Sequence, residues 1–137
     1  MAKRQQLKFR RLLGRYAIVR LDSGAPVPGW AARGEFFSIT RTHDELSIVC
    51  PAENLAADVT SLHRWICFQL EGPFPFSMTG VLLSFIEPLS SSGVPIFAIS
   101  TYDTDYVLVQ EDFAGAALNA LHTAGHELSP CEESERN

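Results

Sequence analysis

The stretch Glu71–Gln110, EGPFPFSMTGVLLSFIEPLSSSGVPIFAISTYDTDYVLVQ, decides the fold of this chain. Its first residues combine Phe, Pro, Ser and Gly, which is typical of a loop. Apolar residues then recur at helical spacing, and these are Leu82, Phe85, Ile86 and Leu89. This pattern predicts a helix over 80–92, with Thr79 as its cap and a bend at Pro88. The remainder predicts two strands, 95–101 and 105–110, joined by a polar turn.

The residues on either side of this stretch complete a larger unit. The apolar run 65–70 precedes it and predicts a strand. After it, Asp112 can cap a second helix whose apolar face carries Phe113, Ala117, Leu121 and Ala124, and Gly125 ends that helix. A short strand over 126–128 follows. The predicted order is therefore βαββαβ, the ferredoxin-like arrangement of an α+β protein.

A weak internal repeat appears when the sequence is shifted by sixty residues. The segment 37–49 then falls on 97–109, with Phe, Ile and Val identical at three positions. Both copies predict a strand, a polar turn and a second strand, which indicates duplication of one supersecondary unit. Coincidence between two ordinary hairpins is the alternative.

The first copy predicts a degenerate unit. Strands are expected at 16–21, 36–41 and 46–50, and a short helix at 54–62. Three glycines and two prolines between Asp22 and Gly34 leave room only for a turn near 27–32. The predicted organisation is a degenerate unit over 1–64, a complete unit over 65–128 and an acidic tail without regular structure over 129–137.

Composition and charge narrow the function classes. The chain has 137 residues, of which 46% are hydrophobic and 20% are charged, as in a globular protein. The net charge of −5 argues against nucleic acid as a partner, although six of the eleven Lys and Arg residues lie in the first fifteen positions. We interpret that basic start as a solvated segment. No apolar run is long enough to span a membrane, and three sparse cysteines without a signal sequence favour the cytoplasm.

Two motifs carry a resemblance to a known family. Phe76–Val81, FSMTGV, and Ile99–Tyr106, ISTYDTDY, occur in this order, and together with their surroundings they resemble the ACT domain over about 34–128. Within that superfamily the chain is similar to the CASTOR-type arginine sensors. The resemblance implies an effector-binding regulatory protein of tandem ACT-like units, commonly paired side by side. It also implies an amino acid, with a basic side chain favoured by nearby acids, as the effector.

The ligand site is expected at the helix start and the hairpin turn. A helix N-terminus attracts a carboxylate, and hairpin carboxylates attract a cationic group, so the pair suits an amino acid. The residues expected to bind it are Phe76, Ser77, Met78, Thr79, Gly80, Val81, Ser100, Thr101, Asp103 and Asp105. A plain capped helix, and an Asp103 that only holds its turn, are the alternatives.

Both faces of the two hairpin strands are apolar, and helices cover only one face, so the companion unit or a second chain must cover the other; we expect a homodimer. Motifs for a catalytic triad, a P-loop or a dinucleotide site are absent from the sequence, and His122 with His126 make a poor metal pair across Gly125. We therefore expect no enzyme activity, no cofactor and no metal. An interaction module with a vestigial pocket, which would bind a regulated protein partner, is the alternative, and a small ferredoxin-like isomerase or lyase is a more distant one.

Overall fold

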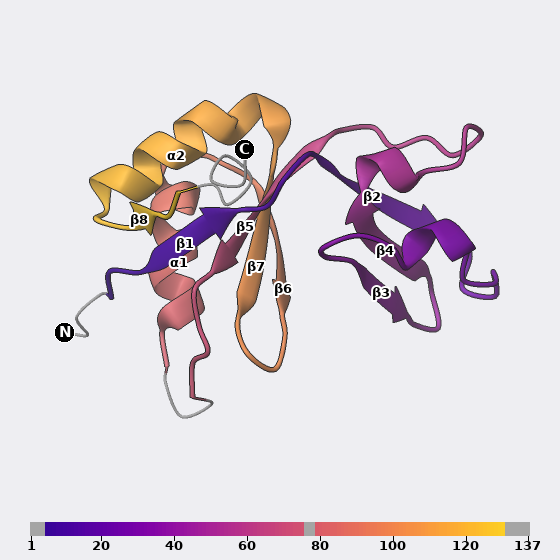
Figure 1. Cartoon of the computed structure of the whole chain (residues 1–137), viewed down its shortest axis with the longest axis horizontal. Coiled ribbons are helices and arrows are strands. Elements are labelled where there is room, and N and C mark those ends of the chain that lie inside the picture. Colours follow the sequence, from indigo (N-terminus) through magenta and orange to yellow (C-terminus); the bar gives the residue numbers. More distant parts are fainter. Residues whose placement is uncertain (1–4, 76–78, 131–137) are drawn as a thin grey trace. The chain divides into compact units, whose positions relative to one another are not determined.

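A computed structural model describes residues 5–75 and 79–130 (Figure 1). The chain forms two compact units, one over 14–65 and the other combining residues up to Leu13 with those from Ile66 onward. We call them the smaller and the larger unit. The expected boundary lies near residue 65 as in this division, but the assignment of the N-terminal residues to the first unit is wrong. None of the helices in the described ranges reaches the length and apolarity that crossing a bilayer requires.

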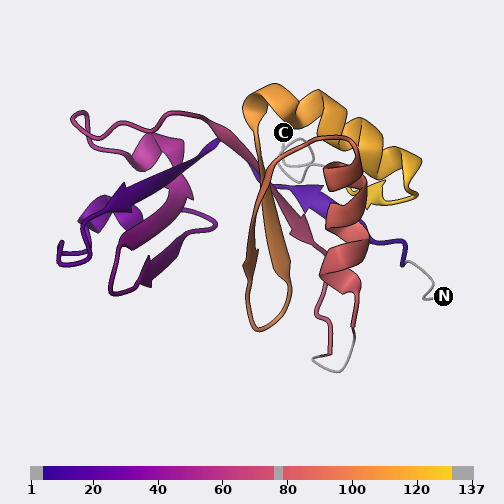
Figure 2. The ribbon, with the colours of Figure 1, turned by 180° about the vertical axis from the view of Figure 1, so that it is seen from behind.

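The larger unit is an α+β structure with both helices on one face of its sheet (Figures 1 and 2). Its strands are β1 (Lys8–Arg11), β5 (Trp65–Leu70), β6 (Ile96–Ser100), β7 (Asp105–Gln110) and β8 (Glu127–Leu128). Its helices are α1 (Val81–Ser91), the 3-10 turn η3 (Glu111–Phe113) and α2 (Ala114–Thr123). The predicted βαββαβ order from β5 to β8 is confirmed.

The N-terminal strand is the main departure from the prediction. The strand order is β6-β7-β5-β1-β8, with β1 antiparallel to β5 and parallel to β8. Residues 8–11 of the basic start are therefore a strand inside the sheet rather than part of a solvated segment. Its alternation explains this placement, because Leu7 and Phe9 are buried while Lys8 between them is exposed.

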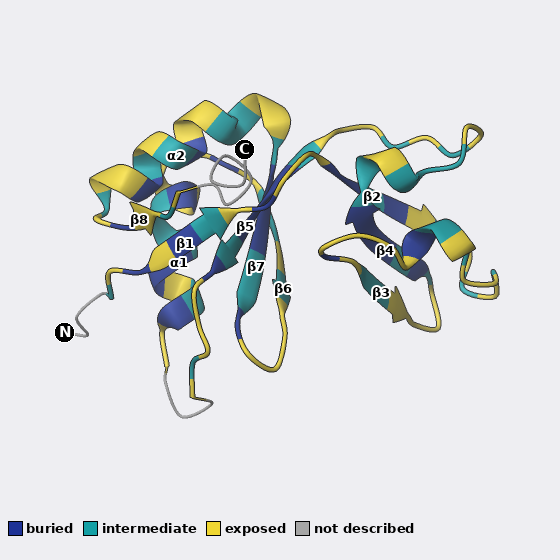
Figure 3. Cartoon of the chain, in the orientation of Figure 1, coloured by how far each residue is buried: buried dark blue, intermediate teal, exposed yellow. Residues whose placement is uncertain are grey.

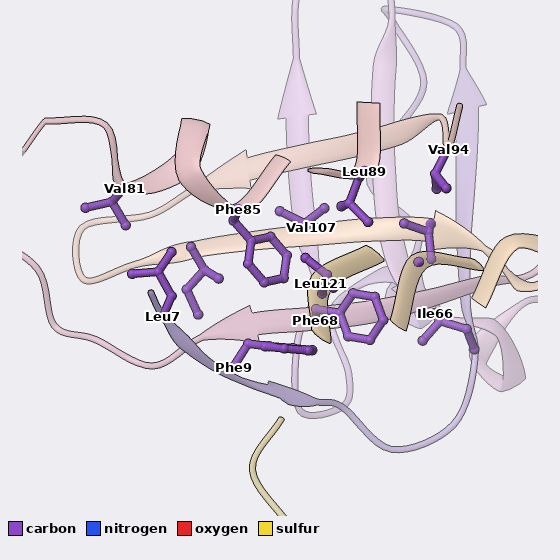
Figure 4. Packing of buried hydrophobic residues seen from close by; sticks show 13 residues of the cluster. Leu7, Phe9, Ile66, Phe68, Val81, Phe85, Leu89, Val94, Val107 and Leu121 are labelled. Carbon is purple, nitrogen blue, oxygen red and sulfur yellow. The ribbon is translucent and has the colours of Figure 1, made fainter. Parts of the chain in front are cut away.

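Aromatic and branched side chains build the core of the larger unit (Figure 4). Phe85 of α1 packs edge-on against Phe9 and Phe68, with ring centroids 5.1 and 6.4 Å apart. Burial of such rings stabilises the fold by roughly 1.5–3 kcal/mol each. The dark-blue segments in Figure 3 trace this packing along β5, β7 and the inner sides of the helices. The helices are thereby fixed over one face of the sheet.

Helix α1 begins differently from the prediction. Gly80 is its N-cap residue, with φ 78° and ψ 2°, and no side chain caps the helix. The prediction that Thr79 caps it is wrong. A left-handed backbone disfavours any residue with a Cβ, so a glycine fits this start. Pro88 lies inside the helix, which nevertheless continues to Ser91.

The smaller unit keeps the strands and lacks the helices of the larger one. Its strands β2 (Tyr16–Leu21), β4 (Leu46–Pro51) and β3 (Ser38–Arg41) form an antiparallel sheet in that order. Two 3-10 turns, η1 (Gly29–Ala31) and η2 (Ala52–Asn54), are its only helical segments within the described residues. The degenerate unit is thus confirmed, but the short helix expected over 54–62 does not form.

The two hairpins of the suggested repeat correspond in structure, with the register shifted by one residue. Arg41 pairs with Leu46 at the end of the first hairpin, and Ser100 pairs with Asp105 at the end of the second. Thr42 therefore corresponds to Thr101, an offset of 59 rather than 60 residues. Both hairpins also lead into a 3-10 turn, η2 and η3, at the same offset. A shift of one residue exchanges the two faces of a strand, so only this register compares side chains that point the same way.

Candidate functional site

A cavity of about 250 Å³ lies in the larger unit, where the hairpin turn meets the loop before α1. Its lining residues come from three segments, and they are Phe74, Pro75, Val81 and Ser100–Asp105. The volume suits a ligand of amino-acid size, since pockets for drug-sized ligands begin at about 300 Å³.

The hairpin turn owes its shape to Thr101. The Thr101 amide donates to the Thr104 carbonyl at 2.8 Å, and the Thr101 hydroxyl donates to the same carbonyl at 3.0 Å. The Thr104 amide in turn donates to the Thr101 hydroxyl at 3.3 Å. A threonine at the start of a turn often holds it in this way. The carboxylate of Asp103 is consequently not what closes the turn.

Main-chain contacts fasten the turn to the loop after β5. The Phe74 amide donates to the Asp103 carbonyl at 3.0 Å, and the Thr104 hydroxyl donates to the Leu70 carbonyl at 2.7 Å. A Cβ on Gly72 would lie 2.9 Å from the Asp103 carbonyl oxygen, so this approach requires glycine. The wall formed by Phe74 and Pro75 therefore stays against the turn.

Asp105 and Ser100 face each other across the base of the hairpin. They form the closing pair of β6 and β7, and the Ser100 hydroxyl donates to Asp105 Oδ1. Asp105 is half-buried and Ser100 is exposed. A carboxylate oriented by a hydroxyl, at the edge of a cavity, is a ready acceptor for a cationic group.

The start of α1 supplies the opposite electrostatic character. Val81, the first residue of the helix, lines the cavity and is buried. The first amides of a helix lack intrahelical partners, and the helix dipole adds partial positive charge there. The helix start and the hairpin carboxylates thus border one cavity.

The cavity brings together half of the residues expected at the site. Val81, Ser100, Thr101, Asp103 and Asp105 line it, whereas Thr79 and Gly80 do not. Phe76, Ser77 and Met78 lie outside the described residues. The sequence prediction missed Phe74, Pro75, Tyr102 and Thr104 as lining residues; the last two lie inside the TYDT turn that already pointed to this place.

Other features of the described ranges provide fewer charged or reactive groups for binding a ligand. They contain no group of three His, Cys, Asp or Glu side chains that could hold a metal ion. A groove of about 600 Å³ runs between α1 and α2, but its lining carries no charge: Pro88, Ser91, Ser92, Ala116, Asn119, Ala120, Thr123 and Ala124. Cys50 and Cys67 are buried and belong to no disulfide, and burial raises the pKa of Cys50.

Two protein-family models match parts of this chain. A family model described as the ACT domain matches residues 60–123, which include the hairpin, the cavity and both helices. Residues 60–123 of this chain are therefore identified with the ACT domain. A second model, describing the N-terminal domain of another protein group, matches residues 14–58 of the smaller unit. The ACT domain match does not include β1, the strand that completes the sheet from the other end of the chain.

Solved structures share the fold of this chain. The crystal structure of protein Atu0741 from Agobacterium tumefaciens is 43% identical, covers 91% of this chain and 93% of its own, and has a TM-score of 0.83. Protein VC0802 from Vibrio cholerae, of unknown function, is 20% identical with a TM-score of 0.69, and the coverage is 88% of this chain and 91% of that one. The ligand-free regulatory subunit of aspartate kinase from Thermus thermophilus is 17% identical with a TM-score of 0.53, over 82% and 93% of the two chains. The last two establish the fold alone.

A curated relative comes from Homo sapiens. The protein CASTOR3P is 31% identical over 90 residues, and the match covers 56% of this chain and 55% of CASTOR3P. This chain thus spans about half the length of that relative. The resemblance to the CASTOR group is confirmed over these 90 residues.

Proposed function

We propose that this chain is a regulatory protein whose ACT domain reversibly binds an amino acid in the cavity at Ser100–Asp105. One observation carries the proposal: Val81, the first residue of α1, and the acidic residues Asp103 and Asp105 line the same cavity of about 250 Å³. A free amino acid carries a carboxylate and an ammonium group, so it matches a site that offers both charge preferences.

The smaller unit supports a cationic ligand group by internal comparison. In the repeat, Arg41 occupies the position of Ser100. The Arg41 guanidinium donates to the carbonyls of Ser23 and Ala25, in the loop that follows β2. This resident cation ties its hairpin to the loop after the preceding strand. The larger unit has Ser100 at the position of Arg41. Its cavity lies next to the loop after β5, which supplies Phe74 and Pro75 to the lining.

A basic amino acid follows from the same comparison. The counterpart of Asp105 in the smaller unit is the apolar Leu46, so the carboxylate at this position is a feature of the larger unit, and a basic ligand side chain can pair with it. Hydrogen bonds between charged groups contribute about 1.5–3 kcal/mol. Arginine and lysine are therefore the first ligands to test.

A thermal-shift screen against the twenty amino acids tests the proposal. A ligand that binds only the folded state stabilises it by about 2.7 kcal/mol at a concentration one hundred times Kd. We expect L-arginine or L-lysine to raise Tm, and the neutral isostere L-citrulline, as matched control, to raise it less. No shift with any amino acid would contradict the proposed function.

A protein-interaction module with a vestigial pocket remains the second candidate. The cavity is small, and the turn around it is already satisfied by its own main-chain bonds at 2.8 and 3.0 Å. A chain that shows no amino-acid binding but captures a regulated partner would fit this alternative. Catalysis receives no support from the cavity, whose lining residues have no histidine, lysine or cysteine among them.

The proposed protein is a homodimer that acts in the cytoplasm. Among the described strands, β6 pairs only with β7, so its outer edge is available to a second copy of the chain, and Phe97 and Ile99 on β6 are half-buried. We include a homodimer on this ground. Cys50, a buried thiol outside any disulfide, supports a reducing compartment, the cytoplasm, as the site of action.

A further inference from the structure

Helix α1 lacks one of its own hydrogen bonds. In an α-helix the amide of residue i donates to the carbonyl of residue i−4, and Pro88 has no amide hydrogen. The carbonyl that loses its donor belongs to Ser84, a residue only 6% exposed. A buried carbonyl without a partner destabilises the folded state, so another donor is required there.

The donor comes from outside the helix. His126, which lies in the turn between α2 and β8 and is 4% exposed, places Nε2 2.8 Å from the Ser84 carbonyl oxygen. The other ring nitrogen, Nδ1, accepts the Leu7 amide at 3.0 Å. Because Nδ1 is the acceptor, the neutral ring carries its proton on Nε2 and donates it to Ser84.

The same junction ties α1 to the N-terminal strand. The Gln5 amide donates to the Ser84 hydroxyl at 3.2 Å, and the Gln5 side chain donates to the Thr79 carbonyl at 3.3 Å. The His126 ring also packs on Phe85, with centroids 5.5 Å apart. One imidazole therefore joins the residue before β1, the first turns of α1 and the approach to β8.

We propose that His126 is a positioning residue of the ligand cavity. It supplies the hydrogen bond that Pro88 cannot make, and it holds the first turn of α1, with the cavity residue Val81, against β1. The part that concerns the ligand rests on the proposed function above. The part that concerns the hydrogen bond stands on geometry alone.

A double-mutant cycle separates this role from ordinary packing. His126→Asn keeps an acceptor for the Leu7 amide and removes the donor to Ser84. Pro88→Ala supplies an amide at position 88 that can donate to the Ser84 carbonyl. We expect His126→Asn to raise the unfolding equilibrium constant about tenfold, which is 1.4 kcal/mol. In the Pro88→Ala background the same substitution should have an effect several times smaller.

A second substitution makes the test specific. His126→Gln retains a donor that can reach Ser84 and loses the acceptor for Leu7, so Pro88→Ala should not rescue it. His122→Asn, on the exposed end of α2, is the matched control and should change stability little. Chemical unfolding of these variants, each with and without Pro88→Ala, gives the coupling energy between position 88 and each substituted histidine. Equal losses in the two backgrounds would overturn the proposal.

Ligand binding supplies the independent readout, with L-arginine as the probe. We expect His126→Asn to weaken L-arginine binding by about three- to tenfold, and Pro88→Ala to restore it. Unchanged affinity in a folded His126→Asn variant would refute the ligand part. Failure of the wild-type protein to bind L-arginine would refute the ligand part together with arginine as the effector, while the stability cycle would still decide the hydrogen-bond part.

Discussion

At the scale of single residues, the most specific prediction concerns the effect of Asp105 on ligand affinity. Its carboxylate accepts from the Ser100 hydroxyl and lines the cavity. Asp105→Asn keeps the shape and this acceptor but removes the charge. We expect L-arginine affinity to fall roughly ten- to a hundredfold, because a charge-assisted bond contributes about 1.5–3 kcal/mol. Calorimetric titration with melting curves measures both binding and stability.

Asp103→Asn is the control for that substitution. Its carbonyl, which the substitution retains, accepts the Phe74 amide, and Thr101 closes the turn. We therefore expect little change in stability and a smaller loss of affinity than for Asp105. An Asp105→Asn variant that binds as tightly as the wild type would remove this carboxylate from the site and favour the vestigial pocket.

Cys50 gives a prediction about reactivity. The residue is fully buried on β4, and desolvation raises the pKa of its thiol. Only the thiolate reacts with alkylating agents, so the folded protein should protect Cys50 at neutral pH. Mass spectrometry after brief iodoacetamide treatment should find it unmodified in buffer and modified in denaturant. Rapid modification of the native protein would show that the smaller unit opens easily.

At the scale of elements, sequence patterns predicted most strands and missed one. The strands 16–21, 65–70 and 105–110 have the predicted bounds because each is rich in apolar residues that favour strands. The pattern Leu7-Lys8-Phe9-Arg10 also alternates, but its basic residues suggested a solvated segment. Its pairing with β5, far along the chain, is a tertiary contact that local propensity does not encode.

The repeat shows how apolar matches can mislead. An offset of 60 aligns Phe, Ile and Val, whereas the turns align at 59, where Thr42 and Thr101 each start a T-x-D-x sequence. Turn hydrogen bonds fix the hairpin register, so the short polar motif was the better guide. The hairpin side of the cavity was predictable for the same local reason. The Phe74 wall was not, because it depends on a contact between distant segments.

The start of α1 provides a test at this scale. Gly80 has φ 78°, and a Cβ there would meet no atom within 4 Å. We therefore expect Gly80→Ala to lower the free energy of unfolding by about 1–2 kcal/mol, because of backbone strain and not because of steric crowding. Gly115→Ala, inside α2 and also without close neighbours, is the matched control. It should stabilise the fold by about 0.5–1 kcal/mol. Denaturant melts that show the same sign for both variants would contradict the assigned helix start.

At the scale of the whole molecule, the first strand of the chain completes the sheet of the larger unit. Residues up to Leu13 and from Ile66 onward form one unit, and residues 14–65 form the other. A tandem of similar hairpins was visible in the sequence. The place of the N-terminal strand in the second predicted unit was not visible, since its pairing with β5 joins segments far apart in the sequence.

The proposed dimer is tested by mass. We expect light scattering at micromolar concentration to give twice the 15.1 kDa of the chain. Replacement of the half-buried Ile99 by lysine, on the edge strand β6, should shift the mass toward the monomer, since an edge lysine disfavours strand pairing. The same replacement of the exposed Leu83 on α1 is the control. A monomeric mass over the whole concentration range would rule the dimer out.

The central claim is that an amino acid binds between the hairpin turn and the start of α1. Backbone NMR spectra during titration with L-arginine test it most directly. The account predicts that the amide signals of Phe74, Val81 and 101–105 move with saturation, while those of the corresponding turn 42–45 in the smaller unit do not. Saturable shifts in the smaller unit or in the α1–α2 groove, with the 101–105 turn unmoved, would contradict it.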